Sequence, residues 1–178
     1  MNHPPTLKKH VILIGMPACG KSTVGVLAAK TLGYRFIDSD LVIQERTGRK
    51  LHRIIRDEGQ DGFLAIEEAV NLTLGNDDAP SIIATGGSAV YSQAAMEHFK
   101  AVGTVVYLRL SYKTVEKRLG NFTHRGVVMP EGYTLRDLYD ERCYLYEKYA
   151  DVIVDEGKTD SIGDVLASLC SHFEEETD

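Results

Sequence analysis

The sequence predicts a three-layer α/β fold, in which a five-stranded parallel sheet carries helices on both faces and a mobile lid. Short apolar runs, typical of buried parallel strands, alternate along the chain with segments of helical periodicity. Between the first strand and the first helix, residues 15–22 read Gly-Met-Pro-Ala-Cys-Gly-Lys-Ser and fit the phosphate-binding pattern G-x-x-x-x-G-K-[ST]. Because no repeat or linker interrupts the 178 residues, we predict a single domain over residues 1–178.

The elements follow from local periodicity and from the turn residues between them. Apolar runs predict strands at residues 11–14, 34–38, 81–85, 104–108 and 152–154. Helical spacing predicts helices at residues 22–32, 41–47, 51–57, 62–74, 92–100, 112–119, 134–149 and 161–173. The segment 120–133 is polar and weakly periodic, and we expect it to form the lid. Regular alternation of strand and helix implies right-handed crossovers and a parallel sheet.

Composition and charge limit the partners. The net charge of −6 argues against broad nucleic-acid or acidic-membrane binding, which requires a basic surface. No apolar run approaches membrane-spanning length, and the first ten residues lack the apolar core of a signal peptide. Three scattered cysteines form neither a disulfide framework nor a zinc motif. We therefore expect a cytoplasmic monomer.

The phosphate-binding loop, or P-loop, predicts that the chain binds a nucleoside triphosphate. Its glycines allow backbone N–H groups to wrap the phosphates, and the following helix adds the positive end of its dipole. Lys21 is expected to reach the terminal phosphates, and the Ser22 hydroxyl is expected to ligate Mg²⁺. We interpret Cys19 as a small neutral filler rather than a redox switch. The predicted nucleotide-binding residues of this P-loop fold are Gly15, Pro17, Ala18, Cys19, Gly20, Lys21, Ser22 and Thr23.

Two aspartates, Asp38 and Asp40, stand at the carboxyl end of the second predicted strand, where open α/β sheets place their ligands. Residues i and i+2 of an extended strand point to the same side, so both carboxylates can face one site. Phosphoryl transfer needs one carboxylate near Mg²⁺ and a base or orienting group for the attacking hydroxyl. Asp38 suits the first role and Asp40 the second. The alternative is that Asp40 only caps the next helix.

Glycines and arginines further along the chain complete the predicted site. Gly86 and Gly87 end the third strand and let a ligand approach the backbone, or they form only a tight turn. Arg118 and Arg125 flank the start of the lid, where an arginine can neutralise the transferring phosphoryl group. Arg142 can grip a carboxylate or phosphate in bidentate geometry. A surface ion pair with a neighbouring acidic residue, Glu141 or Asp140, is the alternative for Arg142.

These motifs resemble the shikimate kinase family, within the nucleoside monophosphate kinase-like branch of P-loop proteins. The resemblance spans most of the chain, through the P-loop, residues 36–40, residues 59–67, residues 84–87, Arg125 and residues 141–151. It implies transfer of the γ-phosphate of ATP to shikimate, giving shikimate 3-phosphate and ADP. It also implies a carboxylate-bearing substrate bound by residues of about 39–75 and a lid at about 120–133.

The resemblance implies a role for each matching residue. Asp38 and Ser22 would hold Mg²⁺, and Asp40 would contact the hydroxyl to be phosphorylated. Lys21, Asp40 and Arg125 would be catalytic, with Arg125 bridging ATP and the acceptor. Arg118 would lie against adenine. Gly86 and Gly87 would offer backbone contacts to the substrate, and Arg142 would grip its carboxylate.

Departures from the family concentrate in the acceptor half. Leu64 replaces the arginine that is the second guanidinium on the shikimate carboxylate, and Ser88 replaces the third glycine of a triplet. Gly126 and Cys143 stand where the family usually has proline. Loss of one of two arginines at a buried carboxylate site costs about 2–5 kcal/mol.

The departures leave open whether Arg53 or Arg56 replaces the missing arginine, and Glu67 is free to orient Arg142. Two alternatives to shikimate phosphorylation follow. The first is a related kinase for another hydroxylated acceptor, such as a sugar acid or a nucleotide. The second is an ATP-binding module that transfers nothing.

Overall fold

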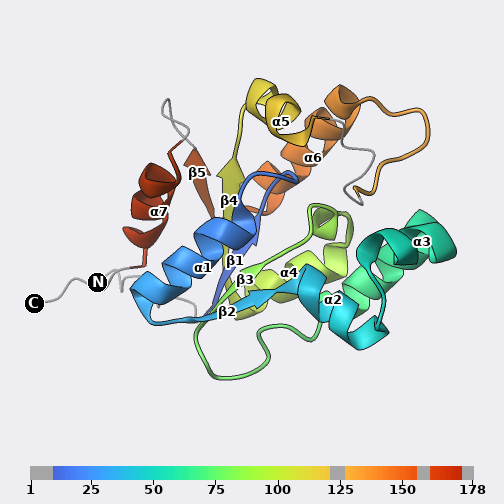
Figure 1. The fold of residues 1–178 in the computed structure, drawn as a ribbon. Coiled ribbons are helices and arrows are strands. Elements are labelled where there is room, and N and C mark those ends of the chain that lie inside the picture. The colour runs from blue at the N-terminus through green and yellow to red at the C-terminus, as the bar shows by residue number, and fades with distance from the viewer. Residues whose placement is uncertain (1–9, 121–126, 156–160, 174–178) are drawn as a thin grey trace, which may run out of the picture.

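The computed structural model describes residues 10–120, 127–155 and 161–173. Five parallel strands form one sheet in the order β2-β3-β1-β4-β5 (Figure 1). Their bounds are β1 His10–Ile14, β2 Arg35–Asp38, β3 Ser81–Ala84, β4 Gly103–Arg109 and β5 Val152–Asp155. Each strand pairs in parallel with its neighbours, so the predicted five-stranded parallel sheet is confirmed.

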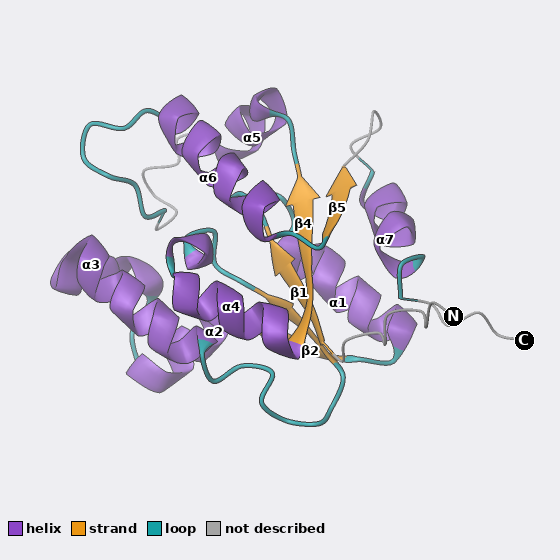
Figure 2. Cartoon of the chain, turned by 180° about the vertical axis from the view of Figure 1, so that it is seen from behind, coloured by secondary structure: helices purple, strands orange, loops and turns teal. Residues whose placement is uncertain are grey.

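The helices cover both faces of the sheet, as predicted. Figures 1 and 2, seen from opposite sides, place α1 and α7 on one face and α4 and α6 on the other. Helices α2 and α3 form a pair beside the β2 edge, and α5 packs against α6. The bounds are α1 Lys21–Leu32, α2 Ser39–Thr47, α3 Leu51–Asn71, α4 Gln93–Val102, α5 Tyr112–Leu119, α6 Leu135–Tyr149 and α7 Ile162–Cys170. None of the described helices is long and apolar enough to cross a membrane.

Strand β1 is buried along its whole length because helices cover both faces of a parallel sheet. The chain goes from β1 to β2 at one edge, returns to β3 beside β1, and then places β4 on the other side of β1. The loops after β1, β2 and β3 therefore meet at the carboxyl ends of the strands, where the strand order reverses. Open α/β sheets bind their ligands at this position.

Helix α3 joins two segments that the sequence predicts as separate helices. Gly59, with φ 72° and ψ −178°, is the non-helical residue between them. The α2–α3 pair has a small core of its own, formed by Ile43, Ile54, Phe63, Val70 and Val128. Val128 belongs to the predicted lid, so the described end of that segment packs against α3. Arg125 lies outside the described residues.

Candidate active site

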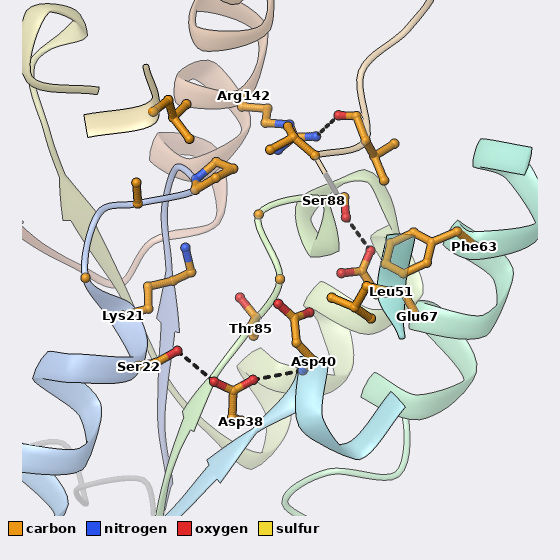
Figure 3. Close-up of a pocket in the computed structure, with 18 of the residues that line it drawn as sticks. Lys21, Ser22, Asp38, Asp40, Leu51, Phe63, Glu67, Thr85, Ser88 and Arg142 are labelled. Atoms are coloured by element: carbon orange, nitrogen blue, oxygen red, sulfur yellow. Dashed lines mark hydrogen bonds between the residues drawn. The ribbon is translucent and has the colours of Figure 1, made fainter. Parts of the chain in front are cut away.

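A cleft of about 340 Å³ opens at the carboxyl ends of β1, β2 and β3 (Figure 3). Segments distant in sequence form it: the P-loop, the end of β2 with the start of α2, both halves of α3, the loop after β3, the end of α5, residues 127–128, and α6. Its described lining is Pro17, Ala18, Gly20, Lys21, Ser22, Thr23, Asp38, Asp40, Leu51, Phe63, Glu67, Thr85, Gly86, Gly87, Ser88, Leu119, Val127, Val128 and Arg142. The structure thus brings together most of the residues predicted for the site.

The P-loop has the backbone that its glycines permit. Gly15, with φ 148°, lies so close to β4 that a Cβ would be 2.7 Å from the Leu108 carbonyl oxygen. Gly20, with φ 85°, turns the chain into the N-terminus of α1. Lys21 Nζ donates to the carbonyl oxygens of Gly15 at 2.8 Å and Met16 at 2.9 Å. The loop thereby holds Lys21 in the part of the cleft next to the P-loop, which is called the nucleotide half below. The part around Asp40, Glu67 and Arg142 is called the acceptor half.

Cys19 lies beneath the loop rather than in the cleft. Its side chain is fully buried, and its Sγ accepts a hydrogen bond from Lys21 Nζ at 3.6 Å. Gly15 and Cys19 are the predicted nucleotide-binding residues of the P-loop that do not line the cleft. Their contribution is to the shape of the loop, which agrees with Cys19 as a filler.

Asp38 joins the P-loop to α2. Its Oδ2 accepts a hydrogen bond from Ser22 Oγ at 2.6 Å, and its Oδ1 accepts from the backbone N–H of Asp40 at 3.0 Å. Leu41 N–H also donates to Oδ1, at 3.3 Å. Asp38 is therefore the residue that caps α2, and the alternative that gave this role to Asp40 is wrong. Capping fixes the Asp38 carboxylate beside Ser22 and leaves the Asp40 carboxyl to the cleft.

Asp40 faces the cleft as predicted (Figure 3). Burial and, to a smaller extent, the nearby Asp38 carboxylate raise its pKa to about 6, with Lys21 opposing both effects. A carboxyl group with this pKa is ionised at neutral pH and is still basic enough to accept a proton. These are the properties of a general base.

Gly86 and Gly87 matter because a side chain would not fit at either position. A Cβ on Gly86 would lie 2.2 Å from Glu67 Oε1 and 3.1 Å from Asp40 Oδ1. A Cβ on Gly87 would lie 3.0 Å from Arg142 Nη1. The Gly86 N–H already donates to Ser39 Oγ at 3.1 Å. Gly86 thus provides space between two carboxyl groups, and its backbone contact to a substrate stays a prediction.

Arg142 is directed into the protein and is only 1% exposed. Its Nε donates to the Tyr91 hydroxyl at 3.2 Å, and Nη2 donates to the Val128 carbonyl oxygen at 2.5 Å. The alternative of a surface ion pair is wrong, because Asp140 pairs with Arg136 and Glu141 accepts hydrogen bonds from Tyr91 and Tyr133. Nη1 is the nitrogen next to Gly87 in the cleft.

Glu67 is the residue of the site whose surroundings differ most from expectation. Its Oε2 accepts a hydrogen bond from Ser88 Oγ at 2.7 Å, whereas its buried Oε1 has no partner among the described residues. No hydrogen bond in the described part of the chain joins it to Arg142, which it was expected to orient. The pKa of Glu67 is raised to about 7, mainly by burial and also by Asp40, while the Ser88 hydrogen bond, Arg142 and Lys21 oppose the shift.

Leu64 does not face this cleft. It packs partly buried against the α2–α3 core and lines a second cavity of about 260 Å³ with Glu68, Asn71 and Tyr91, among others. Glu67 and Ser88 line both cavities and separate them. Sequence reasoning missed the contact of Tyr91 with Arg142, and periodicity offers no signal for a contact across 51 residues.

Arg118, Arg53 and Arg56, the other described arginines considered for the site, are not among the residues that line the cleft. Arg118 Nη1 donates to the Ala18 carbonyl oxygen of the P-loop at 3.4 Å. Arg53 and Arg56 are exposed on α3, and Arg56 pairs with Asp57. Among the described lining residues, Lys21 and Arg142 are the cations. Neither Arg53 nor Arg56 therefore replaces the arginine missing at position 64.

Comparison with known proteins gives a consistent result. The family model for shikimate kinase matches residues 17–173. The shikimate kinase of Thiobacillus denitrificans is 39% identical over 158 residues, which are 88% of this chain and 86% of the relative. That of Vibrio cholerae is 39% identical over 153 residues, 83% of this chain and 85% of the relative. A structure of shikimate kinase from Acinetobacter baumannii in complex with shikimate has a TM-score of 0.81 and 30% identity, covering 96% of this chain and 97% of that one.

Proposed function

The chain belongs to the shikimate kinase family, and from this we propose that it transfers the γ-phosphoryl group of ATP to a hydroxyl group of shikimate. The products are shikimate 3-phosphate and ADP. The cleft supports this assignment, because it combines a P-loop, a partly buried carboxyl group with a raised pKa and a buried guanidinium. Phosphoryl transfer depends mainly on positioning and on electrostatic stabilisation, and these groups serve both purposes.

Asp40 acts as the base. The acceptor hydroxyl donates its hydrogen bond to the Asp40 carboxylate, and the proton moves to that carboxylate as the new O–P bond forms. The bond between the γ-phosphorus and the bridging oxygen breaks, and ADP leaves with its electron pair. Lys21 exchanges its hydrogen bonds to Gly15 and Met16 for phosphate oxygens, and its charge stabilises the transferring group.

Ser22 and Asp38 would hold Mg²⁺. Their oxygens are 2.6 Å apart at the foot of the P-loop and are the hard donors that this ion prefers. The described residues contain no cluster of three or more His, Cys, Asp or Glu side chains able to hold a metal. This fits an ion that takes few protein ligands and completes its shell with phosphate oxygens and water. When bound, Mg²⁺ supplies neutralising charge to the phosphates.

Arg142 binds the shikimate carboxylate through Nη1, while Tyr91 and Val128 fix the plane of its guanidinium. Residues of α2 and α3 form the opposite wall, in agreement with a substrate-binding region of about 39–75. Arg118 supports the nucleotide half from α5, and Arg125 in the lid serves as the further cation on the transferring group. The free cysteines suit a reducing compartment such as the cytoplasm.

A second candidate is a kinase for another hydroxylated acceptor. It is favoured by Arg142, the one guanidinium among the described residues that line the cleft. A carboxylate held by a single arginine binds less tightly than one held by two. An acceptor with a smaller or less charged anchoring group suits this wall better.

The test is product formation by the purified full chain with ATP and Mg²⁺. Shikimate is compared with quinate, gluconate and a nucleoside monophosphate, with ADP release followed continuously and the product identified by phosphorus NMR. We expect shikimate 3-phosphate and the highest kcat/KM for shikimate. Preferential turnover of another compound would establish the second candidate. ATP binding without consumption across the panel would instead indicate a non-catalytic module.

A further inference from the structure

A partly buried carboxyl group and a fully buried one converge on one glycine in the acceptor half of the cleft. Gly86 lies between Asp40 Oδ1 and Glu67 Oε1, and the missing Cβ would be 3.1 Å from the first and 2.2 Å from the second. Figure 3 shows both carboxyl groups on the same side of the cleft, one from α2 and one from α3. The proposed reaction uses Asp40 and gives Glu67 no role.

Glu67 has one oxygen fixed and one oxygen unpartnered. Ser88 Oγ holds Oε2 at 2.7 Å, while Oε1 has no hydrogen-bond partner among the described residues. Glu67 is 2% exposed, and a buried oxygen without a partner is costly. Such an atom in a cleft indicates a donor that arrives with the ligand.

The charges around Glu67 favour a neutral hydrogen-bond donor to its Oε1. Asp40 adds negative charge, and Lys21 and Arg142 attract Glu67 from the P-loop and from α6. Neither cation forms a hydrogen bond with Oε1 in the described residues. Arg142 uses Nε and Nη2 for Tyr91 and Val128. A hydroxyl group fits next to Oε1, because it donates a hydrogen bond without bringing the charge that an anionic group would add.

Leu64 and Ser88, two positions at which the acceptor half departs from the family pattern, both line the second cavity together with Glu67. Leu64 is apolar and brings no hydrogen-bond donor to Glu67, whereas the Ser88 hydroxyl donates to it. The Ser88 hydrogen bond engages Oε2, so Oε1 is the oxygen left toward Gly86 and Asp40.

We propose that Glu67 recognises the acceptor directly, by accepting a hydrogen bond from the hydroxyl group adjacent to the one that is phosphorylated. Asp40 and Glu67 together bind a vicinal diol, with Ser88 holding Glu67 in place. This rests on the proposed function and names the specificity-determining group of the same site. In shikimate the reacting hydroxyl is on C3, so the neighbouring hydroxyl is the one on C4.

The experiment measures kcat and KM for shikimate, 4-deoxyshikimate and 5-deoxyshikimate with the wild-type chain, Glu67→Gln and Glu68→Gln. Glu68 is the matched control, because it is the next residue on α3, bonds to Ser92 at 2.5 Å and does not line the active cleft. Loss of the C4 hydroxyl should lower wild-type kcat/KM about ten- to a hundredfold, and more than loss of the C5 hydroxyl. Melting temperature and the KM for ATP establish that each variant is folded.

Glu67→Gln should lower kcat/KM for shikimate by a similar factor, mainly through KM, and should barely affect 4-deoxyshikimate. Glu68→Gln should leave the discrimination between acceptors unchanged. Equal losses with both acceptors in Glu67→Gln would overturn the assignment and leave the proposed function intact. If Glu67→Gln does not fold, equal losses of the two hydroxyls in the wild type would also overturn it. Failure of the wild type to phosphorylate shikimate would refute the proposed function itself.

Discussion

The two halves of the cleft satisfy their polar groups in different ways. In the nucleotide half, Lys21, Ser22 and Asp38 are all hydrogen-bonded to the P-loop or to the start of α2. In the acceptor half, Asp40 is partly buried and Glu67 is buried, both have raised pKa values, and one oxygen of Glu67 has no partner among the described residues. The polar groups of the nucleotide half bond to one another, whereas the acceptor half holds two carboxyl groups whose ionisation is made unfavourable by their surroundings. Burial of this kind is a common way to tune groups for chemistry and recognition.

The largest effect should come from Asp40→Asn, which separates chemistry from nucleotide binding. An amide cannot take up the proton of the acceptor hydroxyl, so kcat should fall about 10²- to 10⁴-fold. The KM for ATP should be unchanged, since Asp40 is not bonded to the P-loop. Steady-state kinetics measure both values, with the exposed Asp57→Asn as a control that keeps activity. A parallel rise in the KM for ATP would mean that the two halves are not separate.

Glu67→Gln should make the free energy of unfolding less dependent on pH, because it removes a carboxyl group whose pKa is raised in the folded protein. The folded-state pKa of Glu67 is raised from the model-compound value of 4.5 to about 7. The folded protein therefore binds this proton more tightly, and the stability contributed by the protonated group is lost as pH rises from 4.5 through 7. Between pH 5 and pH 8 the wild type should lose about 1–3 kcal/mol relative to the variant. Urea unfolding at both pH values measures it, and a pH-independent difference would contradict it.

Leu64→Arg should change the acceptor half only when Ser88 is also replaced. An arginine at position 64 can reach Glu67, three residues further along α3, but Ser88 already occupies one oxygen of that carboxyl group. We expect little change from Leu64→Arg alone, and a KM for shikimate about tenfold lower when Ser88→Gly is added. A full gain from the single variant would mean that Ser88 does not control Glu67.

The smallest effect should come from Arg118→Ala in the nucleotide half. Its hydrogen bond to the Ala18 carbonyl oxygen is long, at 3.4 Å, and has a neutral acceptor. The KM for ATP should rise about three- to tenfold and the KM for shikimate should stay constant. Arg136→Ala is the matched control, since this exposed arginine pairs with Asp140 on α6. A change in the shikimate KM would show that α5 also supports the acceptor half.

The sequence predicts the nucleotide half well because that half is local. A strand, a glycine-rich turn and a helix start are contiguous, and Asp38 follows a strand whose position in the sheet is fixed by topology. The acceptor half depends on contacts between distant segments, such as Arg142 with Tyr91 and Val128 or Glu67 with Ser88. Periodicity carries no information on such contacts. It predicts Leu64 as part of a helix but not which of two cavities the side chain lines.

The close approach of Gly86 to Glu67 limits which residue types can occur together at positions 86 and 67. Because a Cβ at this position would come within 2.2 Å of Glu67 Oε1, the identities of residues 86 and 67 are tied to each other. Natural relatives and selected libraries should either keep glycine at position 86 or pair a larger residue there with a shorter one at position 67. Such covariation among relatives would reflect how closely the carboxyl groups of Asp40 and Glu67 approach Gly86.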